Sequence, residues 1–187
     1  AQAGAAKPPA ANGIWLSKDA RTGTVYFRKQ WTTASKVKSA KLTITADNSF
    51  TAFVNGKEVG SGNNWNTRYQ FDVTKHLRLG DNVLAVRAGN EGSIAGLAAQ
   101  LDLESDKGQK VRMVTDKSWK STDQKREGWM APGIKRSGWR EPFVHGSMGM
   151  GPWGDVFSGQ VIAKSATIRS EERRVGKEGR SRWSPYQ

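Results

Sequence analysis

The chain has 187 residues, which is enough for one sizeable domain and too few for two ordinary ones. It contains no cysteine, which excludes disulfides, thiolate metal sites and thiol nucleophiles. It has no long apolar run, which excludes a transmembrane span, and we predict no membrane as a partner. The formal net charge of +13 favours contact with polyanions.

The first 13 residues are rich in Ala, Pro and Gly and do not begin with Met. A stretch of this kind is what the cleavage of a signal peptide after small residues leaves behind. We therefore predict a flexible leader over 1–13 and a secreted or periplasmic protein.

Short strands are predicted from there on, because apolar and polar side chains alternate over 25–31 and 40–46. The strands at 50–54 and 57–59 flank Asn55-Gly56. This dipeptide accepts the positive φ angles of a two-residue turn, so it predicts a β-hairpin.

Four more strands are predicted, at 69–73, 82–88, 97–103 and 111–115. Asp72 or Thr74 is a candidate cap for a single helical turn that ends before Gly80. No long helix is predicted. Short strands separated by Gly, Asn and Asp turns indicate an all-β protein, an antiparallel sandwich or barrel.

Residues 116–154 are rich in Trp, Gly and Pro, and they predict long ordered loops held by buried indoles. We expect core positions for three of the four tryptophans here, Trp119, Trp139 and Trp153. Trp129 is the indole to test for exposure.

Several segments resemble one known family. They are "YFRKQW", "AKLTITADNSFTAFVNGKEVGSG", "FDVTKHLRLGDNVLAVRAGN", "AGLAAQLDL", "VTDKSWK" and "GPWG". In this order, over roughly 14–155, they resemble galactose-binding-like jelly-roll domains of secreted glycoside hydrolases. The most similar are the amino-terminal carbohydrate-binding domains of α-L-rhamnosidases and the sugar-binding domains of β-galactosidase-like enzymes. The resemblance implies an antiparallel β-sandwich over 14–160, often with bound calcium and a glycan site at one edge.

The resemblance also implies a site. Asp47 and Asn48 match a pair that, in rhamnose-binding members, coordinates calcium and sugar hydroxyls, and Trp65 occupies a place similar to that of an aromatic that stacks on the sugar. Calcium prefers six to eight oxygen ligands, which these two polar side chains could help to supply. The alternative is that Asp47 and Asn48 only form a turn that ends a strand, while Trp65 fills the sandwich edge.

Other polar side chains are candidates for the same site. Asn64 and Arg68 complete the predicted carbohydrate-binding set, although the asparagines of 63–66 are more typical of loop formation. We predict Arg68, Arg87 and Asn90 near the same rim, where they suit the carboxylate or sulfate groups of an acidic glycan. Solvated surface charge is the alternative for each arginine. His145 and His76 are each more typical of structural or exposed positions.

The predicted function is that of a non-catalytic carbohydrate-binding or accessory domain with a glycan as partner. The alternatives are a structural domain without a ligand and a binder of acidic polysaccharide or another polyanion. The sequence has no distinctive pair of carboxylates and no Gly-x-Ser-x-Gly motif, so we do not predict an enzyme. Nucleic acid is not favoured as a partner, because the positive charge is spread along the chain without a recognisable motif.

The last segment, 161–187, is a basic tail that we expect to be disordered or non-native. Over 169–187 it resembles the in-frame translation of a common sequencing-adapter oligonucleotide, except at Gly179 and Gln187. Such a tail is typical of a gene read from a truncated metagenomic fragment. We therefore expect the natural protein to continue past about residue 165 into further domains.

Overall fold

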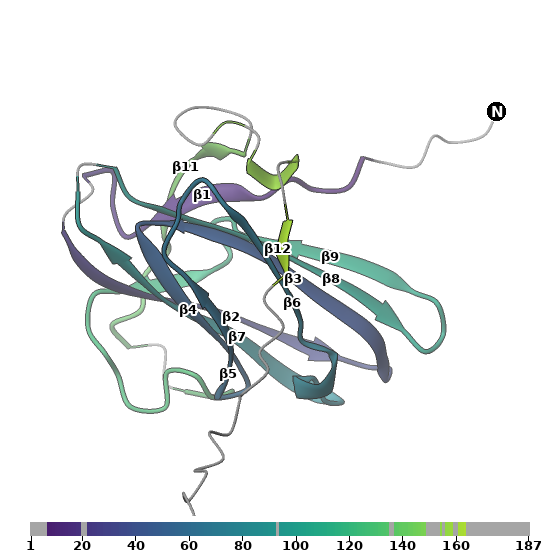
Figure 1. Cartoon of the computed structure of the whole chain (residues 1–187). Helices are drawn as coiled ribbons and strands as arrows, with labels where there is room; N and C mark the ends of the chain where they lie inside the picture. The colour runs from purple at the N-terminus through teal and green to yellow at the C-terminus, as the bar shows by residue number, and fades with distance from the viewer. Residues whose placement is uncertain are drawn as a thin grey trace, which may run out of the picture.

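The fold is a β-sandwich of two sheets, which Figure 1 shows as two layers. The computed structural model describes residues 7–19, 22–92, 94–134, 137–148, 154, 156–158 and 161–163. The two layers are the seven-stranded sheet, in the order β11-β1-β8-β3-β6-β12 with β9 paired to β8, and the five-stranded sheet, in the order β10-β2-β7-β4-β5. The predicted all-β sandwich is confirmed.

The seven-stranded sheet consists of β1 (Asn12–Trp15), β3 (Val37–Asp47), β6 (Arg68–Asp72), β8 (Gly96–Ser105), β9 (Lys110–Val114), β11 (Phe143–Ser147) and β12 (Val161–Ala163). The five-stranded sheet consists of β2 (Gly23–Thr33), β4 (Ser49–Val54), β5 (Lys57–Gly62), β7 (Gly80–Asn90) and β10 (Lys120–Thr122). Two single 3-10 turns complete the described elements, η1 (Thr74–His76) and η2 (Val156–Ser158). No helix of the described chain is long and apolar enough to cross a membrane.

The core lies between the two sheets, and strand alternation explains which side chains fill it. Leu42, Ile44 and Ala46 of β3 are almost completely buried, and they face aromatic and aliphatic side chains of the other sheet such as Phe27 and Val86. Burial of this apolar surface is the main term that stabilises the sandwich. The intervening residues of β3 point to the outer face of the seven-stranded sheet.

The hairpin between β4 and β5 is confirmed at the predicted turn. Asn55 and Gly56 have φ angles of 49° and 81°, as a two-residue turn of this type requires. The predicted helical turn is also present, as η1. Asp72 precedes it, and the Asp72 carboxylate accepts hydrogen bonds from the backbone N–H and the hydroxyl of Thr74, at 2.9 and 2.6 Å.

The strands extend beyond the predicted sandwich limits of 14–160 at both ends. β1 begins at Asn12, inside the predicted leader, and Ala11 before it is buried. β12 lies past residue 160 and pairs with β6 in a parallel register. The adapter-like segment 169–187 lies outside the described residues.

The tryptophans differ from expectation at two positions, Trp129 and Trp139. Trp119 is buried as predicted, and its indole N–H donates to the Val114 carbonyl at 3.0 Å. Trp129, the candidate for exposure, is also buried, because its ring packs edge-on against Tyr26 and Phe53 on the outer face of the five-stranded sheet. Trp139 is only half-buried, and Trp153 lies outside the described residues.

Candidate functional site

The polar pair Asp47 and Asn48 stands where the chain passes from one sheet to the other. β3 of the seven-stranded sheet ends at Asp47, and β4 of the five-stranded sheet begins at Ser49. The connection 91–95 makes the reverse passage from β7 to β8. Asp47 pairs with Gly96 and Ser49 pairs with Gly89, so both crossings meet at one edge of the sandwich, which we call the rim.

Asn48 is tied to the neighbouring crossing. Its backbone N–H donates to the Gly89 carbonyl at 2.7 Å, and its side-chain Oδ1 accepts from the Glu91 N–H at 2.6 Å. The Asp47–Asn48 peptide bond is cis. Because Oδ1 is engaged, the side-chain amide is held in one orientation. Its Nδ2 donates a hydrogen bond to no residue that the structure describes.

Asp47 has a different environment from that of Asn48. Its side chain points outward, half-buried, opposite Gly96, which has no side chain to cover it. Among the described residues none donates a hydrogen bond to its carboxylate, and burial raises the pKa of Asp47. A partly desolvated carboxylate without donors gains from any hydroxyl or cation that reaches it.

Asn90 completes the polar side of the rim. It is buried at the end of β7, and its side chain closes a local turn: Nδ2 donates to the Gly92 carbonyl at 2.8 Å and Oδ1 accepts from the Gly92 N–H at 3.1 Å. Asn90 therefore shapes the crossing loop that carries the Glu91 N–H. Sequence spacing did not reveal the contact between Asn48 and Glu91, because the two residues are 43 positions apart.

Trp65 lies in the loop between β5 and β6 and is 41% exposed. Its carbonyl accepts a hydrogen bond from the Thr45 hydroxyl at 2.9 Å. Thr45 and Asp47 are two positions apart on β3 and so share the outer face, about 7 Å from each other. The structure thus anchors the loop beside the strand that ends in Asp47 and leaves the indole accessible.

The remaining predicted site residues are engaged elsewhere. Asn64 forms its own turn, with its Oδ1 accepting from the Asn66 N–H at 3.0 Å. Arg68 points outward from β6 and donates to the Phe157 carbonyl. Arg87 points outward from β7 of the other sheet, where it contacts Thr51. Arg68 and Arg87 were predicted near one rim. Strand alternation places their side chains on opposite outer faces, and Arg87 lines a small pocket with Ser49 and Gly89 of the rim.

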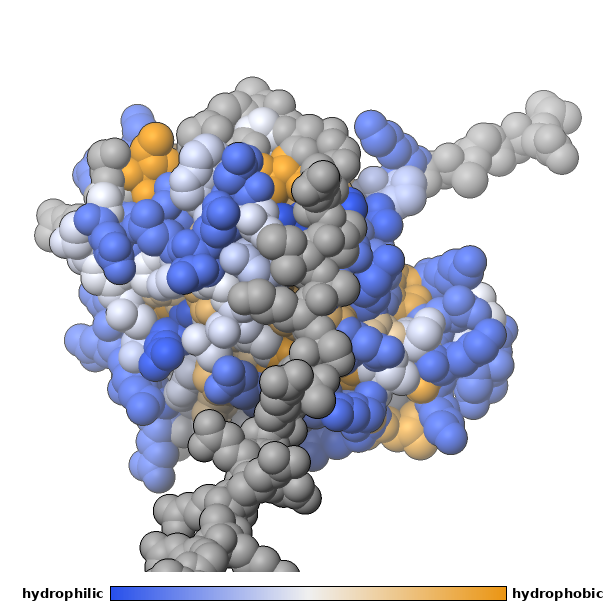
Figure 2. All heavy atoms as spheres, in the orientation of Figure 1, coloured by the Kyte–Doolittle hydropathy of each residue, from blue (hydrophilic) through white to orange (hydrophobic). Residues whose placement is uncertain are grey.

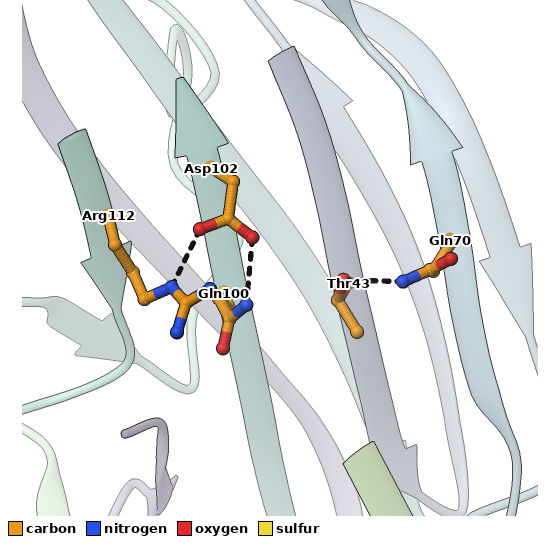
Figure 3. A network of polar contacts seen from close by, with 5 residues as sticks. All are labelled: Thr43, Gln70, Gln100, Asp102 and Arg112. Carbon is orange, nitrogen blue, oxygen red and sulfur yellow. Dashed lines mark hydrogen bonds and ion pairs between the residues drawn. The ribbon is translucent and has the colours of Figure 1, made fainter. Parts of the chain in front are cut away.

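A group of polar contacts that the sequence did not predict covers part of the outer face of the seven-stranded sheet. Figure 3 shows the Gln70 amide donating to the Thr43 hydroxyl, at 3.3 Å, across β3 and β6. The carboxylate of Asp102 accepts from Gln100 at 2.8 Å and pairs with Arg112 at 2.6 Å. The face seen in Figure 2 is mostly hydrophilic outside the grey atoms, with apolar side chains in separate patches.

Metal ligands are sparse at the rim. Within the described residues no group of three or more His, Cys, Asp or Glu side chains could hold a metal ion. The Asp47 carboxylate and the second lone pair of the Asn48 carbonyl are the oxygens that would suit calcium, which needs six to eight. These two side chains fit a calcium ion only if backbone carbonyls, water or a bound ligand supply the other oxygens.

Comparison with known proteins places the fold among sugar-handling proteins. The chain is 33% identical over 173 residues to an α-L-rhamnosidase of Streptomyces avermitilis, covering 86% of this chain and 16% of that protein. The crystal structure of the S. avermitilis enzyme complexed with L-rhamnose superposes with a TM-score of 0.73 at 32% identity, over 79% of this chain and 16% of that one. No known family model matches the chain.

A lectin is also similar. The Pleurotus ostreatus lectin in complex with GalNAc has a TM-score of 0.72 at 31% identity, over 78% of this chain and 44% of the lectin. The resemblance to galactose-binding-like domains of α-L-rhamnosidases is thereby confirmed. The chain spans only about a sixth of the curated rhamnosidase that it matches.

Proposed function

We propose that this galactose-binding-like β-sandwich is a non-catalytic carbohydrate-binding domain of a larger glycan-active protein, and that it holds a sugar at the rim. The observation that carries this proposal is a half-buried Asp47 carboxylate, to which no described residue donates, at the end of the strand whose Thr45 anchors the loop of the exposed Trp65. The similarity to a rhamnosidase and to a lectin supports a sugar as the ligand.

The rim side chains have complementary roles toward a saccharide. The two carboxylate oxygens of Asp47 accept hydrogen bonds from neighbouring hydroxyls, while the Asn48 Nδ2, oriented through Glu91, donates to a sugar oxygen. Trp65 offers an indole face to the C–H face of the ring. One charged acceptor, one fixed donor and one flat apolar surface are the elements that orient a small polar ligand in a site.

Calcium belongs to the proposal as a bridging ion. Asp47 and Asn48 would hold it, and when bound it would supply a hard cation that accepts sugar hydroxyls as ligands. The small number of carboxylates at the rim favours an ion that binds together with the sugar rather than before it. Secretion, proposed from the composition of residues 1–13, would place the domain where both polymeric glycan and calcium are abundant.

The test is sugar binding by the whole chain, with an Asp47→Asn variant. L-rhamnose and GalNAc are the first probes, measured by isothermal titration with calcium and with a chelator. Asp47→Asn keeps the shape but removes the charge, so we expect at least about tenfold weaker binding, the effect of one lost charge-assisted contact. Asp106→Asn, in the exposed turn between β8 and β9, is the matched control.

Each outcome decides a different part of the proposal. If the Asp47→Asn variant binds sugar with unchanged affinity, the rim is not the sugar-binding site. Unchanged sugar affinity in the presence of the chelator would refute the role of calcium and would leave the rim as the proposed sugar site. If no glycan of a broad array binds the folded chain, the domain is a structural accessory unit that only packs against its neighbours.

A further inference from the structure

A second concave site lies on the five-stranded sheet, away from the rim. β10 pairs with β2 only over residues 26–28, so no described strand covers this side of β2 from residue 29 to 33. A pocket of about 300 Å³ opens at this free edge, which we call the edge pocket. Its lining includes Arg28, Gln30, Trp31, Ser118, Lys120 and Trp139.

Arg28 brings an uncompensated positive charge to the edge pocket. The residue is 7% exposed, and its guanidinium donates to two neutral acceptors, the Ala131 carbonyl at 2.8 Å and the Gln30 Oε1 at 3.3 Å. Neither of the two ion pairs found among the described residues involves it. Burial lowers the pKa of Arg28. A buried cation without a counter-ion costs free energy that an anion in the pocket would offset.

Two indole N–H groups of the edge pocket also lack acceptors. The Nε1 atoms of Trp31 and Trp139 are buried, and neither has a hydrogen-bond partner among the residues that the structure describes. An unpaired buried donor costs about 1–3 kcal/mol. Trp31 packs against the core between the sheets and Trp139 against the outer face, so a ligand oxygen reaches either N–H only after a small shift of the ring. The guanidinium carbon of Arg28 lies 5.8 Å from the centre of the Trp139 ring, which places charge and aromatic surface side by side.

The side chains that line the edge pocket are therefore positively charged or neutral. Arg28 and Lys120 are cationic, Trp31 and Trp139 add indole rings, and no described lining residue is acidic; the nearby carboxylate of Asp81 is engaged by the hydroxyl of Thr32 at 2.7 Å. Gln30 is already occupied, because its Oε1 accepts from Arg28 and from the Gly133 N–H at 3.3 Å each. A ligand that fits this arrangement carries a negative charge, several further oxygen acceptors and a ring with an apolar face.

We propose that the edge pocket is a second saccharide site and that it binds an anionic sugar, a hexuronate. Its carboxylate lies against Arg28 and Lys120, its hydroxyl and ring oxygens accept from Trp31 and Trp139, and its C–H face packs on an indole. The volume is at the lower end of small-molecule pockets and suits one sugar residue. The site uses no residue of the rim, so it can bind whether or not the rim does.

The experiment follows the indole N–H signals of the ¹⁵N-labelled full chain by NMR. The eight tryptophans give eight such signals, and Trp31→Phe and Trp139→Phe assign the two of interest. We expect D-galacturonate to shift both signals and D-galactose, its neutral counterpart, to leave them unchanged. Lys120→Gln should weaken galacturonate binding about fivefold, the effect of one partly exposed charge pair. Lys107→Gln, in the turn after β8, should not.

Three controls separate this proposal from simpler explanations. Sodium acetate tests the carboxylate alone: equal affinity for acetate would overturn a sugar site. Equal shifts with D-galactose would overturn the role of charge, and no shift of either signal with D-galacturonate would overturn the site. Asp47→Asn should retain both shifts, so a failure of the rim proposal leaves this result intact, whereas a shift confined to Trp65 would assign galacturonate to the rim.

Discussion

The two ends of the sandwich are built from the same strands but differ in how completely their polar groups are paired. At the far end, Asn55 follows the last residue of β4, and Asn82 is the third residue of β7. At the rim, β4 begins after Asn48 and β7 finishes at Asn90. Both ends carry a pair of asparagines and a carboxylate: at the far end Asp72 precedes η1, whose His76 carbonyl accepts from Asn55, and at the rim Asp47 precedes Asn48.

The far end is closed by a saturated network. Asn82 is fully buried, and its amide bonds to Asn55, Thr33 and the backbone of Arg78 and Gly80 at 2.8–3.1 Å. Asn55 also donates to the His76 carbonyl of η1, which follows Asp72. At the rim, by contrast, the Asp47 carboxylate has no described donor. Polar residues at a strand end thus serve stability where they are saturated, and they are available for binding where they are not.

The largest expected effect is on folding, at the far end. Asn82→Ala leaves several buried groups unpaired, so we expect the free energy of unfolding to fall by about 3 kcal/mol. Asn48→Ala removes one side-chain bond at the half-buried rim and should cost about 1 kcal/mol. Urea denaturation of both variants checks the difference, and equal losses would contradict the distinction between the two ends.

The next effect is on binding, at the rim. Trp65→Ala should weaken sugar binding about tenfold through the loss of the ring contact, about 1.4 kcal/mol. Because the residue is 41% exposed, its free energy of unfolding should change by less than about 0.5 kcal/mol. Titration calorimetry and urea denaturation measure the two quantities. A large loss of stability with unchanged binding would make Trp65 a packing residue.

The smallest expected effect concerns the pKa values of the two carboxyl groups, Asp72 and Asp47. Hydrogen bonds from the hydroxyl and N–H of Thr74 lower the pKa of Asp72, so its contribution to stability is present above the unfolded-state pKa and is lost as pH falls through the folded one. Burial raises the pKa of Asp47, so its contribution is present below the unfolded-state pKa and is lost as pH rises through the folded one. NMR titration of the carboxyl carbons should find Asp47 above the usual range and Asp72 below it. The reverse order would refute the assignment.

Much of the fold was predictable from local sequence. Alternation in β3 and the positive φ angles of Asn55-Gly56 depend on neighbouring residues, and both predictions are confirmed. The short strands β1, β10, β11 and β12 were missed, since three to five residues carry little periodicity and tertiary pairing decides their conformation. Trp129 was misjudged for a related reason: it is covered by Tyr26 and Phe53, which lie 103 and 76 positions away in sequence.

The candidate site was predictable in part. Asp47, Asn48 and Trp65 were proposed from a resemblance, and whether they bind sugar stays a prediction. Their surroundings depend on long-range contacts such as Asn48 with Glu91, which one sequence cannot supply. The edge pocket could not be foreseen, because Arg28 and Trp139 come together only when the loop after β10 folds over β2.

The meeting of two crossings at the rim has a mechanical consequence. Asp47 and Asn48 link the layers in one direction, and 91–95 links them in the other. A sugar bound to residues of both crossings would connect the two sheets and would oppose their sliding past each other. If a sugar binds at the rim, occupancy should therefore make the sandwich harder to deform.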